Sequence, residues 1–275
     1  MLGPLCFVIF YNDFPAARED DESVLYAEDD TDNVSDNDPV ALQYKIQREA
    51  DLSTSWVNDN KLICSGSKTK LLIIGTKELR KSRLEAKLSI TVAGHRVEET
   101  PSKKLLGLAI NNTMTWTNHL HGNKEDKGLL PKLSQRAGLI RKLSKVMPPD
   151  RLRIVANGIF FSLLSYGIQI FGCVSGLDDY ADGPGRFQSL TREDSRKIQT
   201  VMNVVLRAIT NLDRYTPVLS LLKTSGFLSF HQMCAHSTLK TTHKILLARQ
   251  PEYLCQELLS STQVAERLRM QEAKN

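Results

Sequence analysis

The sequence predicts an α+β fold, with antiparallel strands in its first part and helices in its second. The run SVLYA (residues 23–27) has the composition of a short strand and leads into a turn rich in aspartate. The run LSITVAGHRVEE (residues 88–99) alternates on either side of Ala93 and Gly94, as a β-hairpin does. After Trp116 the strand patterns fade and helical periodicity takes over. The order of elements is not the regular strand-helix alternation of a doubly wound fold.

The remaining elements of the first part follow from local signals. The apolar segment 2–15 is expected to be a helix or a core segment that Pro15 ends, and an acidic linker (residues 16–23) follows it. DNVSDN (residues 32–37) is expected to be the return strand or a loop. Asp38 followed by Pro39 predicts the start of a helix that runs to about Asn60. Two more strands are predicted, a buried one in KTKLLIIGT (residues 68–76) and one in KKLLGLAINNTMTW (residues 103–116).

The second part is expected to be helical. Leu133, Ala137 and Ile140 trace one face of a basic helix, and Thr216–Pro217 is expected to cap another helix that ends near Gly226. The loop of residues 175–186 separates helical blocks. Residues 154–176 are uncharged and long enough to span a bilayer, but their polar side chains favour a buried helix and no contact with a membrane.

Charge is distributed unevenly along the 275 residues, which carry a net charge of +5. Ten acidic residues and no lysine or arginine lie between Glu19 and Asp38, whereas basic clusters dominate from Lys61 onward. One part of the chain could therefore hold a cation and another a polyanion, although an acidic loop beside solvated helix faces has the same pattern. The five scattered cysteines, with no CxxC pair, favour a reduced, intracellular protein in the cytoplasm or the nucleus.

The acidic turn LYAEDDT (residues 25–31) is the strongest chemical signal. Carboxylates fixed on a tight turn repel one another unless a cation lies between them. Mg²⁺ takes oxygen ligands at about 2.0–2.1 Å, and two such ions can clamp the attacking and leaving oxygens of phosphoryl transfer. By itself this turn has three interpretations: a solvated turn, a metal site, or the trace of one.

The surrounding segments resemble the reverse transcriptases of non-LTR retrotransposons. In order, the matching segments are LGPLCFVIFYNDFP, LYAEDDT, STSWVNDNKL, SGSKTKLLIIGT and LLGLAINNTMTW, and the similarity continues to LLSYGIQIFG. The resemblance covers nearly the whole chain. It implies that residues 1–113 are the later part of a polymerase palm, an antiparallel sheet with helices, and that residues 114–275 are a mostly helical, thumb-like and C-terminal region.

By this resemblance Tyr26 and Ala27 match the first two positions of the family's YADD hairpin and would contact the nucleic acid. Glu28 and Asp29 fall on its two catalytic aspartates. The metal-binding residues would be Glu28 and Asp29, with Asp30 replacing Glu28 if Glu28 is an insertion, and the ion would be Mg²⁺ or Mn²⁺. Lys68 falls on a lysine that positions the nucleotide or protonates pyrophosphate, and Leu105, Leu106 and Gly107 fall near the primer-gripping hairpin. The implied partners are an RNA template and a DNA primer, with no small-molecule cofactor beyond nucleotides.

Two departures from the family pattern predict that this chain lacks polymerase activity. The fingers and the first palm aspartate of the family precede the LGPL segment, and here only Met1 precedes it. Glu28 stands where the family has aspartate, and an added methylene moves the carboxylate by more than a preorganised site tolerates. We favour substitution over insertion, because an inserted residue needs a bulge or a longer turn.

We therefore expect a truncated reverse-transcriptase-like protein, with a non-enzymatic nucleic-acid-binding remnant as the alternative. In that alternative the basic residues of the helical half follow a nucleic-acid backbone, although they could equally form a solvated face. These residues are Lys132, Arg136, Arg141, Lys142 and Lys145.

Overall fold

The computed structural model describes residues 2–18, 23–27, 29–74, 88–124, 126–172 and 190–260. It confirms the α+β class, with helices and small antiparallel sheets. The chain divides into two compact units, Met1–Met114 and Thr115–Asn275. This division falls one residue from the domain boundary expected from the sequence, and each unit is described below by itself.

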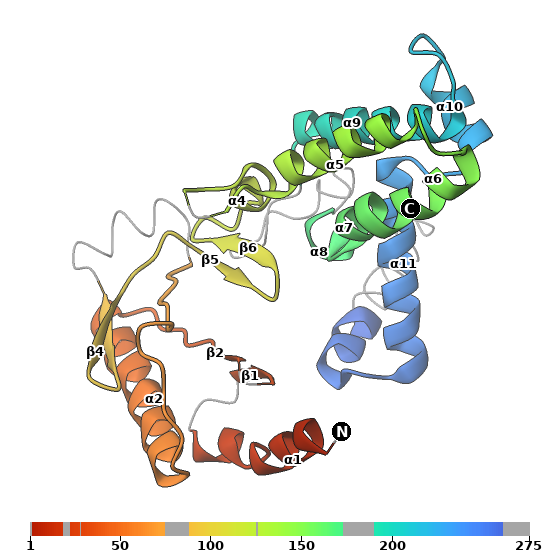
Figure 1. The fold of residues 1–275 in the computed structure, drawn as a ribbon. Coiled ribbons are helices and arrows are strands. Elements are labelled where there is room, and N and C mark those ends of the chain that lie inside the picture. Colours follow the sequence, from red (N-terminus) through yellow and green to blue (C-terminus); the bar gives the residue numbers. More distant parts are fainter. Residues whose placement is uncertain are drawn as a thin grey trace, which may run out of the picture. The chain divides into compact units, whose positions relative to one another are not determined.

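The first unit contains all the named strands (Figure 1). Its elements are α1 (Gly3–Phe10), η1 (Phe14–Ala17), β1 (Ser23–Tyr26), β2 (Asp29–Asp32), α2 (Pro39–Asp59), β3 (Ser89–Val92), β4 (His95–Glu98), β5 (Ser102–Leu105) and β6 (Leu108–Asn111).

The named strands form three separate antiparallel hairpins, β1–β2, β3–β4 and β5–β6. The single strand expected within residues 103–116 was wrong, because the chain reverses at Leu106 and Gly107 (φ 44° and 87°). The predicted turn at Ala93 and Gly94 is confirmed, with φ of 48° and 78°. Positive φ at both central residues matches the right-handed twist of the flanking strands in a two-residue hairpin.

The segment KTKLLIIGT is buried but forms less strand than expected. Leu71 and Ile73 are both 8% exposed. Among the described residues of this segment only Leu71 makes a β-bridge, a parallel one to Glu99. Gly75 and Thr76 lie outside the described residues. Burial of apolar side chains therefore holds this segment in place more than a strand ladder does.

Helix α2 joins two hydrophobic clusters. Asp38 caps it as predicted, accepting hydrogen bonds from the backbone N–H groups of Val40 and Ala41, and Pro39 is its first residue. The earlier turns pack through Leu42, Ile46 and Ala50 against a cluster formed with β3 and β4. The last turns contribute Trp56 and Val57 to a second cluster, which also contains Phe14 and, at its edge, Tyr11 and Leu25.

Two glutamines of α2 also bind the backbone of β3. Gln43 donates to the carbonyl of Ser89 (2.6 Å) and accepts from its N–H (3.2 Å). One helical turn later, Gln47 donates to the carbonyl of Thr91 (3.0 Å) and accepts from its N–H (2.8 Å). These side chains therefore satisfy backbone groups at the edge of β3 that does not pair with β4.

The apolar N-terminal segment forms a helix, α1, as one of the two expectations had it. This helix is not a core element. Leu5 is 60% exposed and Ile9 is 67% exposed. Phe10 and Tyr11 pack near Trp56, with ring centroids 5.9 Å and 5.2 Å from it. The segment is apolar all round, so burying one side leaves apolar side chains on the other.

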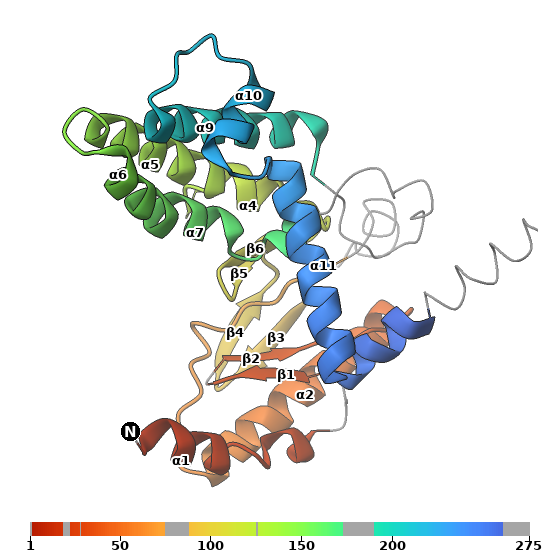
Figure 2. The same cartoon turned by 90° about the vertical axis from the view of Figure 1, so that its right-hand side faces the viewer.

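The second unit is helical in its described residues (Figure 2). Its elements are α4 (Thr117–His121), α5 (Leu129–Leu143), α6 (Pro149–Ala156), η2 (Asn157–Phe161), α7 (Ser162–Ser165), α8 (Ile168–Phe171), α9 (Arg192–Thr210), α10 (Val218–Ser225) and α11 (Phe230–Ala248). A further helical segment covers residues 252–260. The loop expected at residues 175–186 lies outside the described residues.

The core of this unit forms between α5, α6 and α9. Leu133, Ala137 and Ile140 are buried on α5, which confirms the face predicted from their spacing. α10 ends at Gly226 in the left-handed conformation, as predicted. The expected cap at Thr216 was wrong, because α10 begins after Pro217 and has no side-chain cap.

The uncharged segment after α6 is a series of short helices. A π-helical turn, η2, leads into α7, and Tyr166 and Gly167 (φ 68°) separate α7 from α8. Arg136 of α5 donates a hydrogen bond to the carbonyl of Ile159 within the π turn. No helix among the described residues is long and apolar enough to cross a bilayer.

Candidate functional site

The β1–β2 hairpin carries the acidic turn. Its pairing is continuous from Ser23 opposite Asp32 to Tyr26 opposite Asp29, so Ala27 and Glu28 alone connect the strands. Ala27 has a φ of 53°, as a two-residue turn needs, and Glu28 lies outside the described residues. An inserted residue would lengthen the turn or create a bulge. The observed pairing from Ser23 to Asp32 contains no bulge.

The two described aspartates of the predicted metal site lie on opposite faces of the hairpin. Successive side chains of a strand point to opposite faces, and directly paired residues share a face. Asp30 is paired with Leu25, which packs against the Phe14–Trp56 cluster. Asp29 is paired with Tyr26, which is 64% exposed. Asp29 and Tyr26 therefore belong to the open face, and Asp30 to the face that packs on the protein.

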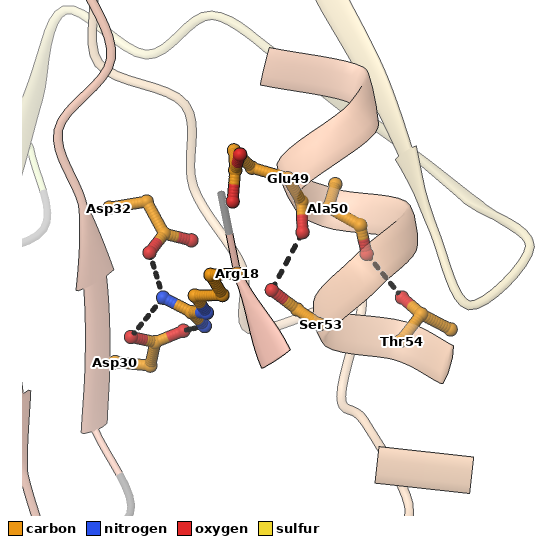
Figure 3. Close-up of polar contacts among 7 residues, drawn as sticks. All are labelled: Arg18, Asp30, Asp32, Glu49, Ala50, Ser53 and Thr54. Atoms are coloured by element: carbon orange, nitrogen blue, oxygen red, sulfur yellow. Dashed lines mark hydrogen bonds and ion pairs between the residues drawn. The ribbon is translucent and has the colours of Figure 1, made fainter. Parts of the chain in front are cut away.

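Asp30 forms an ion pair with Arg18 (Figure 3). One guanidinium nitrogen donates to Asp30 Oδ1 at 3.0 Å, the other binds Asp30 Oδ2, and Asp32 accepts from the same group. The Arg18 side chain is 1% exposed and lies over the Phe14 ring, 4.1 Å from its centroid. Asp30 and Asp32 are two residues apart on one strand, so both carboxylates reach the same cation.

Two titratable groups on this face are partly shielded from water. Burial raises the pKa of Tyr11, and the negative charge of Asp30 raises it further. Burial also raises the pKa of the Cys64 thiol, again with a contribution from Asp30. A carboxylate in such surroundings needs a cation close by, and Arg18 provides it.

Sequence reasoning missed Arg18 and the neighbouring Glu49. Glu49 is 6% exposed and projects from α2 on the side that faces Arg18 (Figure 3). One signal could have identified Arg18, because it directly precedes the acidic run as a single cation. No comparable signal marks Glu49, since its burial depends on how α2 packs.

Asp29 and Asp30 do not form a Mg²⁺ or Mn²⁺ site by themselves, and Glu28, the other expected ligand, lies outside the described residues. Such an ion needs carboxylate oxygens that converge on one point. Asp29 and Asp30 diverge, and Arg18 already neutralises Asp30. Among the described residues, no group of three or more aspartate, glutamate, histidine or cysteine side chains is arranged to hold a metal ion.

The other expected residues of the first unit lie in turns or at strand ends. Lys68 is exposed in a turn where its backbone N–H donates to the carbonyl of Ser65 at 3.0 Å. Leu105 is the last residue of β5, and Leu106 and Gly107 form the following turn. The hairpin implied at these positions is present, and a role in holding a primer stays a prediction.

The five basic residues considered as contacts to a nucleic-acid backbone have different environments. Lys132 pairs with Asp126, and Arg136 binds the Ile159 carbonyl. Arg141, Lys142 and Lys145 are exposed at the end of α5 and just beyond it. Only these last three lie where a nucleic-acid backbone could reach them easily.

Comparison of the chain with family models, with curated proteins and with solved structures finds no match.

Proposed function

We propose that this chain is a reverse-transcriptase-like protein of non-LTR retrotransposon origin that no longer catalyses DNA synthesis. Its ancestral activity would be RNA-directed DNA polymerisation by two-metal nucleotidyl transfer, and its partners would be an RNA template and a DNA primer. The ordered segments around LYAEDDT support the family. The continuous pairing of β1 and β2, with Glu28 at the turn, supports the residue-by-residue match.

Glu28, which stands on the first aspartate of the family's YADD hairpin, is the main support for lost catalysis. Two-metal transfer needs carboxylates that are available to the ions on the substrate side. Asp30, the alternative partner of Asp29, lies on the packed face and binds Arg18. Glu28, with its added methylene, would then be the remaining partner of Asp29 in the turn.

Primer extension on the purified chain tests the proposal. An RNA template with an annealed DNA primer is incubated with nucleotides and Mg²⁺ or Mn²⁺. The expected result is no extension. Extension that Asp29→Ala abolishes would overturn the proposal. The exposed Asp59→Ala is the matched control, because it removes an aspartate at the end of α2, outside the hairpin.

A second candidate function is nucleic-acid binding without catalysis, which the exposed Arg141, Lys142 and Lys145 favour. If each contacts one phosphate, replacing all three by glutamine should reduce the slope of log K against log salt by about 2–3. The control replaces the exposed Lys61, Lys70 and Lys103 by glutamine, which removes the same charge. Equal slopes for the two triple variants would argue against a specific basic surface.

A further inference from the structure

The second unit contains an open cavity of about 500 Å³. Its size is within the range of about 300–1,000 Å³ that is usual for small-molecule sites. The cavity lies between η2, α7 and α8 on one side and α11 with the loop before it on the other; α11 and α7 are labelled in Figure 2. All the lining residues belong to one unit and to the described part of the chain.

One wall of the cavity is apolar and contains two stacked aromatic rings. Phe161 and Phe227 stack with ring centroids 4.4 Å apart and an interplanar angle of 16°. The guanidinium of Arg153 lies over the Phe227 ring, 4.8 Å from its centroid. Phe161 and Phe227 both line the cavity, so this wall offers aromatic surface. Aromatic rings favour offset-stacked or T-shaped contacts with a further ring, such as a nucleobase.

The opposite wall carries positive charge and no acid. His236 and Lys240 lie one helical turn apart on α11, and both line the cavity. None of the lining residues is acidic. The chain contains no aspartate or glutamate between Asp213 and Glu252, so α11 has no acid of its own to neutralise Lys240. An anionic group is therefore the charge that this wall attracts.

The hydroxyl groups between these walls are arranged as acceptors. The Ser162 hydroxyl donates its proton to the carbonyl of Gly158, and the Ser165 hydroxyl donates to the carbonyl of Ser162 at 3.3 Å. A hydroxyl that has donated its proton still offers oxygen lone pairs. A ligand with hydrogen-bond donors, such as sugar hydroxyls or ring amines, matches these oxygens.

We propose that this cavity binds a nucleoside phosphate, with the base against the Phe161–Phe227 wall and the phosphate near Lys240 and His236. The inference rests on the proposal that the chain has nucleic-acid partners, and it adds a base-binding site separate from the β1–β2 hairpin and from the exposed end of α5. The nucleotide could be free or part of a single strand, since both present the same groups.

Binding of a fluorescent single-stranded oligo(dA) to the full chain tests this site. Lys240→Gln should weaken binding about tenfold. Lys244→Gln, one turn further along α11, removes the same charge outside the cavity lining and should weaken it only about twofold. Both lysines are exposed and glutamine is a good helix former, so both variants should fold. An abasic oligonucleotide of the same length should bind the wild type about tenfold more weakly than oligo(dA).

The outcomes separate the possible explanations. Competition by AMP would identify a free nucleotide as a sufficient ligand, and competition by unlabelled oligo(dA) alone would identify a nucleotide within a strand. Equal losses for Lys240→Gln and Lys244→Gln, or equal binding of abasic and normal strands, would overturn the site while leaving general nucleic-acid binding intact. If the wild type binds neither AMP nor the strands, the site and the expected nucleic-acid partners are both refuted.

Discussion

Arg18 is the cation that Asp30 of the acidic motif and the neighbouring Asp32 bind in this structure. Adjacent carboxylates in LYAEDDT predicted a bound cation, and the structure contains a cation there, but it is a guanidinium. Arg18 is 1% exposed and stacked on Phe14, so it is part of the packing of the first unit. A buried guanidinium is always charged and matches a carboxylate with two parallel hydrogen bonds. Asp30 is therefore a structural residue in this protein.

Replacing Arg18 by methionine should destabilise the first unit by about 2–3 kcal/mol. Removing one partner of a buried ion pair costs about 3–5 kcal/mol, and this is reduced here because Asp30 and Asp32 stay 22% and 31% exposed. Urea denaturation followed by Trp56 fluorescence in a Trp116→Phe background measures the change.

The exposed Arg96 provides the control for Arg18. Arg96 Nε lies 3.9 Å from Glu98 Oε1, and the two side chains are 71% and 70% exposed. Arg96→Met should therefore lower the free energy of unfolding by less than about 0.5 kcal/mol. If the two variants lose the same stability, Arg18 has no special structural role.

Asp36, two residues before the N-cap of α2 at Asp38, should contribute to the stability of the fold in a pH-dependent way. The backbone N–H of Asp38 and then the side chain of Lys45 hold the pKa of Asp36 below its ordinary value of 3.8. A lowered pKa in the folded state stabilises the fold above pH 3.8, and this contribution is lost as the pH falls through the folded-state pKa.

Asp36→Asn should therefore lower the urea midpoint at pH 6 and have no effect near pH 2. Carboxylate exposure makes the pH 6 effect small, and 1 M salt should weaken it further. Denaturation series at both pH values, with and without salt, measure it. A difference between wild type and variant that persists unchanged near pH 2 would assign the effect to something other than the charge of Asp36.

At the scale of elements, α2 organises the first unit. It packs on β3 and β4 near its start and on the Phe14–Trp56 cluster near its end. Gln43 and Gln47 also bind backbone groups of β3 that a neighbouring strand would otherwise bind. The helix thereby covers a strand edge that would be open to pairing with another chain.

The double variant with Gln43→Glu and Gln47→Glu should expose this edge. In glutamate a carboxylate oxygen replaces the NH₂ group that donates to the carbonyls of Ser89 and Thr91, so it repels these carbonyls and the whole two-bond contact is lost, including the bond from each N–H. Hydrogen exchange at the backbone amides of these two residues should become at least about tenfold faster, which corresponds to a local loss of about 1.4 kcal/mol.

A matched exchange control exists in α11. Gln232 accepts a hydrogen bond from the N–H of Ser229 in a capping box, and glutamate can accept it equally well. Gln232→Glu should leave exchange near Ser229 unchanged. Unchanged exchange at Ser89 and Thr91 in the double variant would show that the glutamines do not protect the edge.

In the whole molecule, the two units differ in how many large side chains they bury completely. Nearly all the fully buried large side chains belong to the second unit, including Leu133, Phe160 and Met202, whereas Phe14 represents the first. Among the described residues, the named strands of the first unit pair as hairpins, which are marginal without packing. The first unit should therefore unfold more readily than the second.

The two tryptophans make this measurable, because Trp56 lies in the first unit and Trp116 in the second. Each variant with a single tryptophan is unfolded in urea. The fluorescence of Trp56 in the Trp116→Phe variant should change at a lower urea concentration than the fluorescence of Trp116 in the Trp56→Phe variant. Far-ultraviolet circular dichroism of each variant checks that the substitution alone does not shift the main transition. A single coincident transition for both reporters would mean that the chain unfolds as one cooperative unit.

The features that could be predicted from the sequence are those that local chemistry controls. The Asp38–Pro39 helix start, the turn at Ala93 and Gly94, the buried face of α5 and the end of α10 at Gly226 all follow from nearby residues. Residue order alone also supplied the resemblance to reverse transcriptases, which stays a proposal.

The partner of Asp30 could be found only from the tertiary structure. Asp29 and Asp30 are neighbours in the sequence, yet strand alternation separates them and packing pairs Asp30 with Arg18, twelve residues earlier. Likewise, the cavity beside Lys240 combines residues from η2, α7, α8 and α11 that no local pattern connects. Periodicity predicts the faces of an element, but contacts between distant elements decide which charges meet.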